Sequence, residues 1–172
     1  MNLFINSKEH QQGFTLIEML ITIAVAAILL SIVVPSFNSI IESSKERTTR
    51  DSLVSAIYSA KQQAQSERVN VYLCSSNDGE SCADTTDWGS DWLIYQDDDS
   101  SGDLDEDDTI IANISSKTDA ITSEIKEVKF TPTGHSLANT FKICSNTDNA
   151  VVYKMVLSRM GRITYEEASG DC

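Results

Sequence analysis

An almost wholly apolar stretch at residues 14–37 constrains the fold of this 172-residue chain more than any other feature. Its only charged residue is Glu18. A bilayer core about 30 Å thick needs roughly 20 helical residues, so the stretch is long enough to cross a membrane as a helix. No other part of the sequence has an apolar run of this length. We therefore expect residues 14–37 to form a single transmembrane helix, preceded by a polar leader at residues 1–13.

The parts around this stretch are ordered differently from those of a secretory signal, which has a small-residue cleavage site after its apolar core. Here a Gly13-Phe14 junction lies before the apolar run. The arrangement resembles the type IV prepilin signal, and the resemblance rests on Gly13, Phe14, Thr15, Leu16, Ile17 and Glu18, with Pro35 where the family has a helix-kinking proline. It implies that a prepilin peptidase cuts after Gly13 on the cytoplasmic side and that Phe14 becomes N-methylated. It also implies that the apolar segment stays in the inner membrane.

Glu18 has a physical explanation under this interpretation. It lies four residues after Phe14, which is about one helical turn. Cleavage would give Phe14 an α-amino group that is mostly cationic at neutral pH. Because a charge in hydrocarbon needs a partner, we expect Glu18 to pair with the amino group of Phe14, in its own chain or in the next subunit. Pairing with the next subunit would favour assembly. The alternative to the prepilin interpretation is an ordinary signal anchor that happens to contain a glutamate.

Net charge and cysteine content limit the classes of function. The net charge of −13 argues against bulk electrostatic binding to nucleic acid. A single span would place the rest of the chain in the periplasm, where disulfides persist. Four cysteines allow three pairings, of which we favour Cys74–Cys82, which flank a turn-rich loop, and Cys144–Cys172. A zinc site is the rival, but no CxxC pair occurs and His135 is the only histidine outside the leader.

The remainder of the chain has a helical part followed by a β-rich part. Apolar residues recur at helical spacing across 38–67 with charged residues between them, which predicts an amphipathic continuation of the helix. Short strand-like segments separated by turn signals follow, at 69–74, 92–95, 109–112, 125–130, 141–144, 151–157 and 162–165. This order predicts an α+β fold in which a domain at 68–172 packs antiparallel sheets on the second half of the long helix.

The β-rich part contains Leu73-Cys74, the Cys loop, the segment 92–95, an Asp/Gly-rich loop and the late Ser158-Arg159-Met160-Gly161-Arg162. This order of motifs is similar to that of the FimT/GspH family of minor pseudopilins. The resemblance implies a helix with two antiparallel sheets, a place at or near a filament tip, and no enzymatic activity. It further implies a role with other pilin subunits in initiating or capping a type IV pilus. The alternatives are a type II secretion pseudopilus subunit and a DNA-binding component for natural transformation.

The acidic run at 97–108 has the spacing of an EF-hand-like calcium loop. Its candidate ligands, at positions 1, 3, 5, 7, 9 and 12, are Asp97, Asp99, Ser101, Asp103, Asp105 and Asp108, with Gly102 at position 6. Calcium takes six to eight oxygen ligands, which such a set can supply. However, Asp108 is one methylene shorter than the usual glutamate, and the flanks are predicted strands rather than helices. These features favour the alternative of a solvated acidic hairpin loop. We expect no cofactor unless the loop binds Ca²⁺.

Catalysis has little support in the sequence. His135 lies in a predicted turn with no nucleophile motif beside it, so we expect a loop histidine. The carboxylates gather in one loop rather than forming a separated acid and base.

A local excess of basic residues supports the alternative hypothesis of DNA binding. Residues 126–162 contain six Lys or Arg and two acidic residues, a balance of six minus two, or +4. In FimT-type proteins a late Gly-Arg-x-Arg motif is implicated in DNA binding, and here Gly161 and Arg162 match it while Thr164 replaces the second arginine. Arg159 and Lys154 complete the candidate set. The alternative is a solvated strand-turn-strand edge whose charges oppose sheet pairing.

Overall fold

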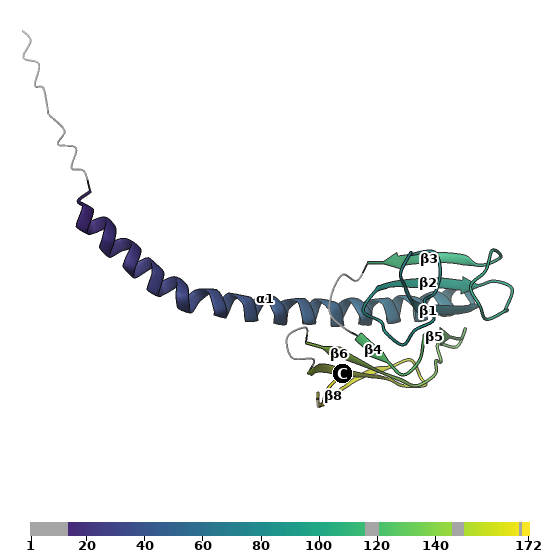
Figure 1. Cartoon of the computed structure of the whole chain (residues 1–172). Coiled ribbons are helices and arrows are strands. Elements are labelled where there is room, and N and C mark those ends of the chain that lie inside the picture. The colour runs from purple at the N-terminus through teal and green to yellow at the C-terminus, as the bar shows by residue number, and fades with distance from the viewer. Residues whose placement is uncertain (1–13, 116–120, 146–149, 169) are drawn as a thin grey trace, which may run out of the picture. The chain divides into compact units, whose positions relative to one another are not determined.

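The computed structural model describes residues 14–115, 121–145, 150–168 and 170–172, apart from the side chains at 33–36 and 39. The predicted leader, including Gly13, lies outside these residues. In chain order the elements are α1 (Leu16–Glu67), β1 (Asn70–Ser76), β2 (Asp91–Asp97), β3 (Thr109–Ile114), β4 (Ile121–Ser123), β5 (Glu127–Phe130), β6 (Asn139–Cys144), β7 (Val151–Leu157) and β8 (Ile163–Glu166) (Figure 1).

The chain divides into two compact units, Met1–Ile41 and Glu42–Cys172. In the first unit, α1 begins at Leu16 and continues through position 35. The large apolar side chains from Phe14 to Ile32 each have 50% or more of their surface exposed. Among the described residues, with their gap in side chains at 33–36, no helical segment is both long enough and apolar enough to cross a membrane.

The second unit consists of two four-stranded antiparallel sheets and the part of α1 from Glu42 onward. The strand orders are β3-β2-β1-β5 and β4-β6-β7-β8. A helical face of α1 is fully buried and shares one core with both sheets; its residues are Leu53, Ile57, Ala60 and Ala64. The predicted α+β class is confirmed, as are the two antiparallel sheets implied by the resemblance.

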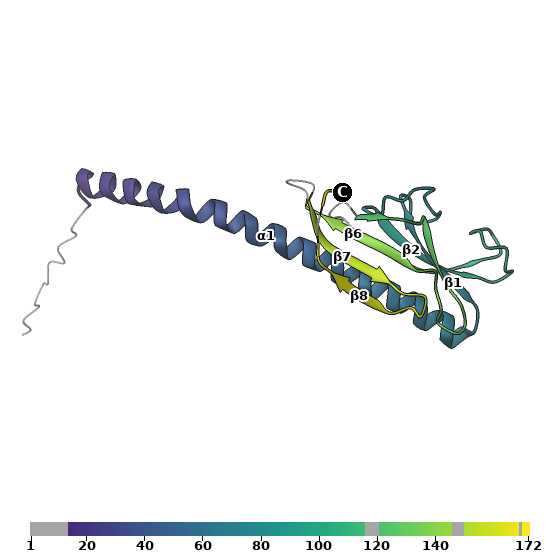
Figure 2. The same ribbon diagram turned by 90° about the horizontal axis from the view of Figure 1, so that it is seen from below.

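β7 and β8 lie along the helix (Figure 2). Arg50 of α1 holds this contact, because its guanidinium lies 4.8 Å from the ring centroid of Tyr153 on β7 and 5.7 Å from that of Tyr165 on β8. Such cation–π contacts stabilise a packed interface by about 0.5–2 kcal/mol. The second sheet is thereby fixed to α1 at the end of the β7–β8 pair that lies away from their connecting turn.

All seven predicted strands are present, with bounds that differ by a few residues. The structure adds β4, which pairs with β6 through Ile121↔Ile143. Ile121 is fully buried, but three residues are too few to show an alternating pattern. The predicted strand at 125–130 begins only at Glu127, because the Ile125 carbonyl instead accepts hydrogen bonds from the side chains of Trp88 (3.0 Å) and Ser123 (2.9 Å).

The face of the first sheet that points away from α1 carries its own small core. We call it the outer-face cluster; it consists of Tyr72 and Cys74 on β1 and Leu93 and Tyr95 on β2. The two tyrosine rings stack with centroids 5.0 Å apart. Leu104 from the β2–β3 loop and Cys82 from the β1–β2 loop pack against the cluster. Both loops therefore fold back over the sheet, which explains why β1 is buried on both faces.

Two disulfides have the pairing expected from the sequence. Cys74–Cys82 has a Cα–Cα distance of 5.7 Å and Cys144–Cys172 one of 6.2 Å, both within the usual range. The first ties the β1–β2 loop to the outer-face cluster, and the second ties the C-terminus to the end of β6. Together they use all four cysteines, so no thiolate remains for the rival zinc interpretation.

Candidate functional site

The residues of the prepilin-like junction lie at the start of α1. Phe14 is 83% exposed. The backbone N–H and the hydroxyl of Thr15 both donate to Glu18 Oε2 at 3.0 Å, and the Glu18 N–H donates to Thr15 Oγ1 at 3.3 Å. This is a capping box, which satisfies amide groups that the first turn of a helix leaves without partners.

Glu18 therefore helps to begin the helix, a role that the sequence analysis overlooked. The signal for it is the Thr-x-x-Glu spacing directly before an apolar run. The proposed pairing of Glu18 with an amino group on Phe14 concerns the cleaved chain, and it stays a prediction.

Three of the four candidate DNA-binding residues, Arg159, Gly161 and Arg162, lie in the turn between β7 and β8. Backbone hydrogen bonds of 2.8 and 2.9 Å close this turn. Lys61 of α1 donates to the carbonyl oxygens of Met160 and Gly161, at 2.9 and 3.1 Å. Both arginines are exposed, and within the described residues neither side chain forms an ion pair.

Gly161 is buried in this turn and has a φ of +65°. A Cβ at this position would lie 2.6 Å from the carbonyl oxygen of Gly134 and 3.0 Å from the side chain of Lys61. Both the left-handed conformation and the close contact require glycine. The glycine of the candidate motif thus faces the protein's own backbone, and only the two arginines face solvent.

Lys154, the fourth candidate, lies on β7 and forms an ion pair of 2.6 Å with Glu166 on β8. Thr164, where the motif would have its second arginine, pairs with Val156 across the sheet. Lys142 is directly opposite Lys154 in the register of β6 and β7. The basic excess of residues 126–162 is therefore spread over the domain, and the β7–β8 turn holds two of its members, Arg159 and Arg162.

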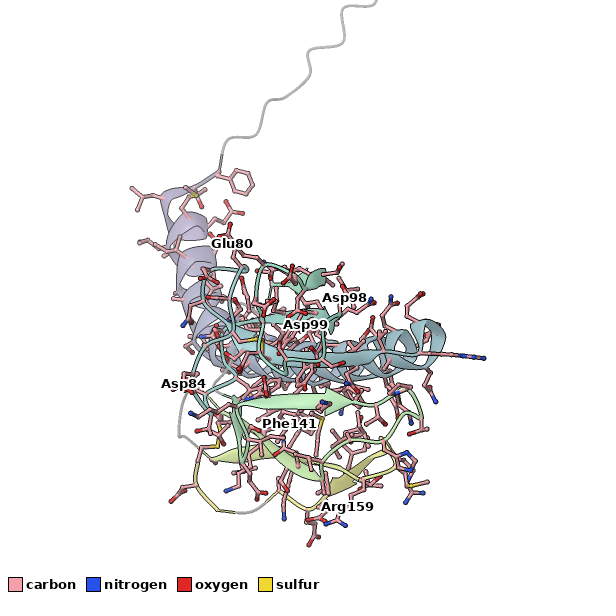
Figure 3. The ribbon with its side chains drawn as sticks, turned by 90° about the vertical axis from the view of Figure 1, so that its right-hand side faces the viewer. Glu80, Asp84, Asp98, Asp99, Phe141 and Arg159 are labelled. Carbon is pink, nitrogen blue, oxygen red and sulfur yellow. A yellow bond between two sulfur atoms is a disulfide. The ribbon has the colours of Figure 1, made fainter. Side chains whose placement is uncertain are left out.

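The acidic loop and this turn are on opposite sides of the core. Asp98 and Asp99 lie on one side of Phe141 and Arg159 lies on the other (Figure 3). Asp98 belongs to the loop that follows β2 of the first sheet, whereas Arg159 follows β7 of the second. The fold therefore separates the acidic loop from the turn, which weakens the repulsion that the loop would exert on a polyanion bound at the turn.

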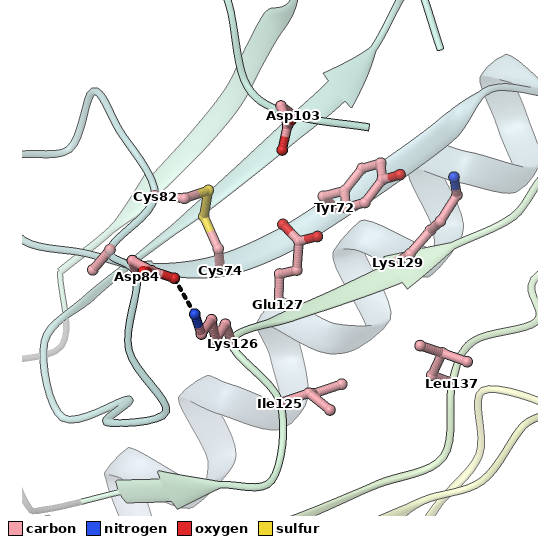
Figure 4. A pocket seen from close by; sticks show the side chains of 11 residues that line it. Tyr72, Cys74, Cys82, Asp84, Asp103, Ile125, Lys126, Glu127, Lys129 and Leu137 are labelled. Carbon is pink, nitrogen blue, oxygen red and sulfur yellow. Dashed lines mark hydrogen bonds and ion pairs between the residues drawn. A yellow bond between two sulfur atoms is a disulfide. The ribbon is translucent and has the colours of Figure 1, made fainter. Parts of the chain in front are cut away.

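A groove of about 630 Å³ lies on the outer face of the first sheet (Figure 4). Tyr72 of β1, Glu127 and Lys129 of β5 and Asp103 of the β2–β3 loop line it. The Lys129 ammonium lies 4.9 Å from the ring centroid of Tyr72. The groove thus combines acidic, basic and aromatic groups, a mixture suited to binding a polar partner.

Glu127 of this groove is electrostatically coupled to Tyr95 of the outer-face cluster. Burial, and then the Asp103 carboxylate, raise the pKa of Glu127 above its usual value near 4.5. Burial, and then the charge of Glu127, raise the pKa of Tyr95. At neutral pH Tyr95 therefore keeps its proton, and its hydroxyl makes a long hydrogen bond of 3.5 Å to Glu127 Oε2.

The only histidine outside the leader is in the turn between β5 and β6. His135 is exposed, and its Nδ1 lies 2.7 Å from Thr133 Oγ1. The turn itself is closed by local hydrogen bonds from Thr131 to the His135 carbonyl. His135 is thus a loop histidine, as expected.

The structure brings part of the candidate calcium set together. Carboxylate oxygens of Asp97, Asp99 and Asp108 lie within 4.8 Å of one another, and those of Asp99, Asp105 and Asp107 form a second such group. Ser101 and Asp103, the other two candidates, contact each other, since the Ser101 hydroxyl donates to the Asp103 carbonyl oxygen at 3.1 Å.

Comparisons with known proteins match both parts of the chain. The family described as type II transport protein GspH matches residues 49–161, and the prokaryotic N-terminal methylation motif matches residues 9–34. Two crystal structures of the type IV minor pilin FimU from Pseudomonas aeruginosa have a similar fold. The first is 22% identical in sequence and covers 73% of this chain and 98% of the FimU chain. The second is 21% identical and covers 76% of this chain and 97% of the FimU chain. Both have a TM-score of 0.53. No curated protein sequence matches the chain.

Proposed function

The chain belongs to the GspH family, and we propose that it is a minor pilin that helps to initiate or cap the assembly of a type IV pilus. It is a structural subunit of the pilin and pseudopilin class, with an N-terminal methylation motif and a pilin-like fold. The finer role at a filament tip is supported by the resemblance of its motifs to the FimT/GspH minor pseudopilins.

The observation that carries the proposal is the start of α1. The capping box of Thr15 and Glu18 begins a helix whose apolar side chains, from Phe14 to Ile32, are exposed. Exposed apolar surface of this extent marks a site for another protein or a membrane. In the proposed function the inner membrane covers these side chains before assembly, and the helices of neighbouring pilin subunits cover them afterwards.

Processing follows from the same motif. We place the cut of the prepilin peptidase between Gly13 and Phe14, with methylation of the new amino group and the domain from Glu42 onward in the periplasm. Mass spectrometry of the membrane-extracted protein should find an N-methyl-Phe14 terminus. Recovery of residues 1–13 from cells with an active prepilin peptidase would contradict this.

Variants at the helix start separate the two roles of Glu18. Glu18→Gln keeps a capping side chain at this position and removes the charge, whereas Thr15→Ala weakens the cap and keeps the charge. We expect cleavage of both, loss of Glu18→Gln from sheared filaments, and retention of Thr15→Ala. If Glu18→Gln enters filaments as well as the parent chain does, the charge-pairing argument is wrong.

Filament counts distinguish initiation from shaft building. Cells without an initiating subunit should carry fewer pili of normal length, because few filaments start. Cells without a shaft subunit should carry shorter ones. A normal number of pili, together with loss of a secreted enzyme from the medium, would instead support the type II pseudopilus, which the description of the matching family favours.

The second candidate function is DNA binding. The observation that favours it is the pair of exposed arginines, Arg159 and Arg162, in the turn that Lys61 fixes to α1. Such a site contacts phosphates and carries no base specificity.

A further inference from the structure

The β2–β3 loop is the most strongly charged segment of the chain. Eight of the twelve residues at 97–108 are acidic and none is basic. The ion pairs of the described residues lie elsewhere, between Glu42 and Lys45, Arg50 and Asp51, Asp84 and Lys126, and Lys154 and Glu166. No Lys or Arg among the described residues therefore pairs with the carboxylates of this loop.

Asp97, the last residue of β2, is buried with only 2% of its surface exposed. It follows Leu93 and Tyr95 at strand spacing, so it shares their face of the sheet, beneath the loop. Its Oδ1 accepts a long hydrogen bond of 3.4 Å from the Gly102 N–H, and its Oδ2 is buried without a hydrogen-bond partner. A buried carboxylate oxygen needs a donor or a cation.

Other oxygens converge with those of Asp97. One carboxylate oxygen from each of Asp97, Asp99 and Asp108 lies within 4.8 Å of the other two. Two ligands of one calcium ion, each about 2.3–2.6 Å from it, are at most about 5.2 Å apart, so the spacing of the three oxygens is compatible with a single ion between them. Amide hydrogen bonds orient two of them, from Ser101 to Asp99 Oδ1 (2.8 Å) and from Asp98 to Asp108 Oδ1 (3.0 Å). These bonds leave lone pairs for a metal.

The backbone of the loop supports the same interpretation. Gly102, at the position where calcium loops turn sharply, has a φ of +90°. An oxygen of Asp105 lies within 4.8 Å of one on Asp99. With the Ser101 hydroxyl and the Asp103 carbonyl, the loop offers six oxygens, the smallest number that calcium takes.

We propose that the β2–β3 loop binds one calcium ion, with the carboxylates of Asp97, Asp99 and Asp108 as its central ligands. The solvated-hairpin alternative does not account for the burial of Asp97. Binding ties the loop to the sheet, because Leu104 of the loop packs on the outer-face cluster and Asp103 lines the groove. Calcium thereby fixes one wall of the groove.

The test is a calorimetric titration of the full chain in detergent, stripped of calcium by a chelator. We expect a Kd for Ca²⁺ of about 10⁻⁴–10⁻³ M, as in other extracellular modules, and weaker binding of Mg²⁺, which demands a smaller octahedral site. Asp99→Asn, at an exposed position that tolerates substitution, should weaken Ca²⁺ binding by about tenfold, since affinity follows the number of charged ligands.

Glu106→Gln is the matched control. It removes the same charge from an exposed position of the same loop, outside the ligand set, and should leave the affinity nearly unchanged. Equal weakening in Glu106→Gln and Asp99→Asn would overturn the proposal, because it would show diffuse attraction to an acidic surface. Absence of heat at about 10 mM Ca²⁺, tenfold above the weakest extracellular modules, would overturn it as well.

Discussion

The packing of the β7–β8 turn can be tested with a single methyl group. In Gly161→Ala the new Cβ would lie 2.6 Å from the Gly134 carbonyl oxygen, which is backbone, and 3.0 Å from the Lys61 side chain, which can move aside. Gly170→Ala is a matched control. Its φ of +85° also lies in the left-handed region, but a Cβ there meets nothing within 4 Å. The two variants share the backbone strain and differ in the steric contact.

The expected difference follows from these contacts. Left-handed backbone costs an alanine about 1–2 kcal/mol, and the reduced entropy of the unfolded chain offsets about 0.4–1 kcal/mol of that. Gly170→Ala should therefore lower the free energy of unfolding by about 1 kcal/mol or less. The overpacked contact adds about 1–3 kcal/mol, so Gly161→Ala should lose about 1–4 kcal/mol. At about 4 °C per kcal/mol for a domain of this size, the melting temperatures of the variants should differ by about 4–12 °C.

Thermal unfolding of the full chain, followed by tryptophan fluorescence, measures this difference. Trp88 and Trp92 are fully buried, so their emission reports loss of the core. Equal melting temperatures for Gly161→Ala and Gly170→Ala would refute the steric argument. They would mean that the β7–β8 turn moves away from Gly134 at little cost in free energy.

Two further predictions concern the groove and the arginine turn. Because the pKa of Glu127 is raised in the folded chain, the parent loses stability as pH rises from about 4.5 through that raised pKa. Glu127→Gln should therefore melt higher than the parent at pH 7 but not at pH 4. A difference in melting temperature between variant and parent that stays constant from pH 4 to pH 7 would contradict the raised pKa of Glu127. Two phosphate contacts, from Arg159 and Arg162, predict weak DNA binding whose log affinity falls with log salt at a slope of about −2, steepening to about −3 in Thr164→Arg. A gel shift at low salt with no retardation of DNA by the parent or by Thr164→Arg would exclude this function.

Local patterns made most of the fold predictable. The spacing of Leu53, Ile57 and Ala60 gives the buried face of α1, and the end of the helix near Glu67 was predicted from the change of period. β4 escaped prediction because its three residues form a strand only through pairing with β6, which follows it in the chain. A segment of three residues is too short to show the alternation of apolar and polar residues that predicts a strand.

The candidate sites were less predictable, because their properties depend on parts of the chain far apart in sequence. Alternation along β2 places Asp97 on the same face as Leu93 and Tyr95, but it does not show that this face is buried. Burial arises when the β2–β3 loop folds back and Leu104 packs on the sheet. The contact of Lys61 with the β7–β8 turn joins residues about a hundred positions apart and has no local signal either.

The β7–β8 turn shows how a motif can be divided between fold and function. Gly161 is required by its φ of +65° and by the approach of Gly134, so its presence would be expected whether or not DNA binds. Lys154 is already paired with Glu166, and the Glu166 carboxylate reduces the attraction of Lys154 for a phosphate. The DNA hypothesis therefore depends on two exposed arginines, and it predicts that Arg162→Ala removes about half of the salt dependence. It also predicts that Gly161→Ala weakens DNA binding only if it unfolds the turn, because Gly161 itself does not contact DNA. Comparison of the two variants therefore distinguishes a structural effect on the turn from the loss of a phosphate contact.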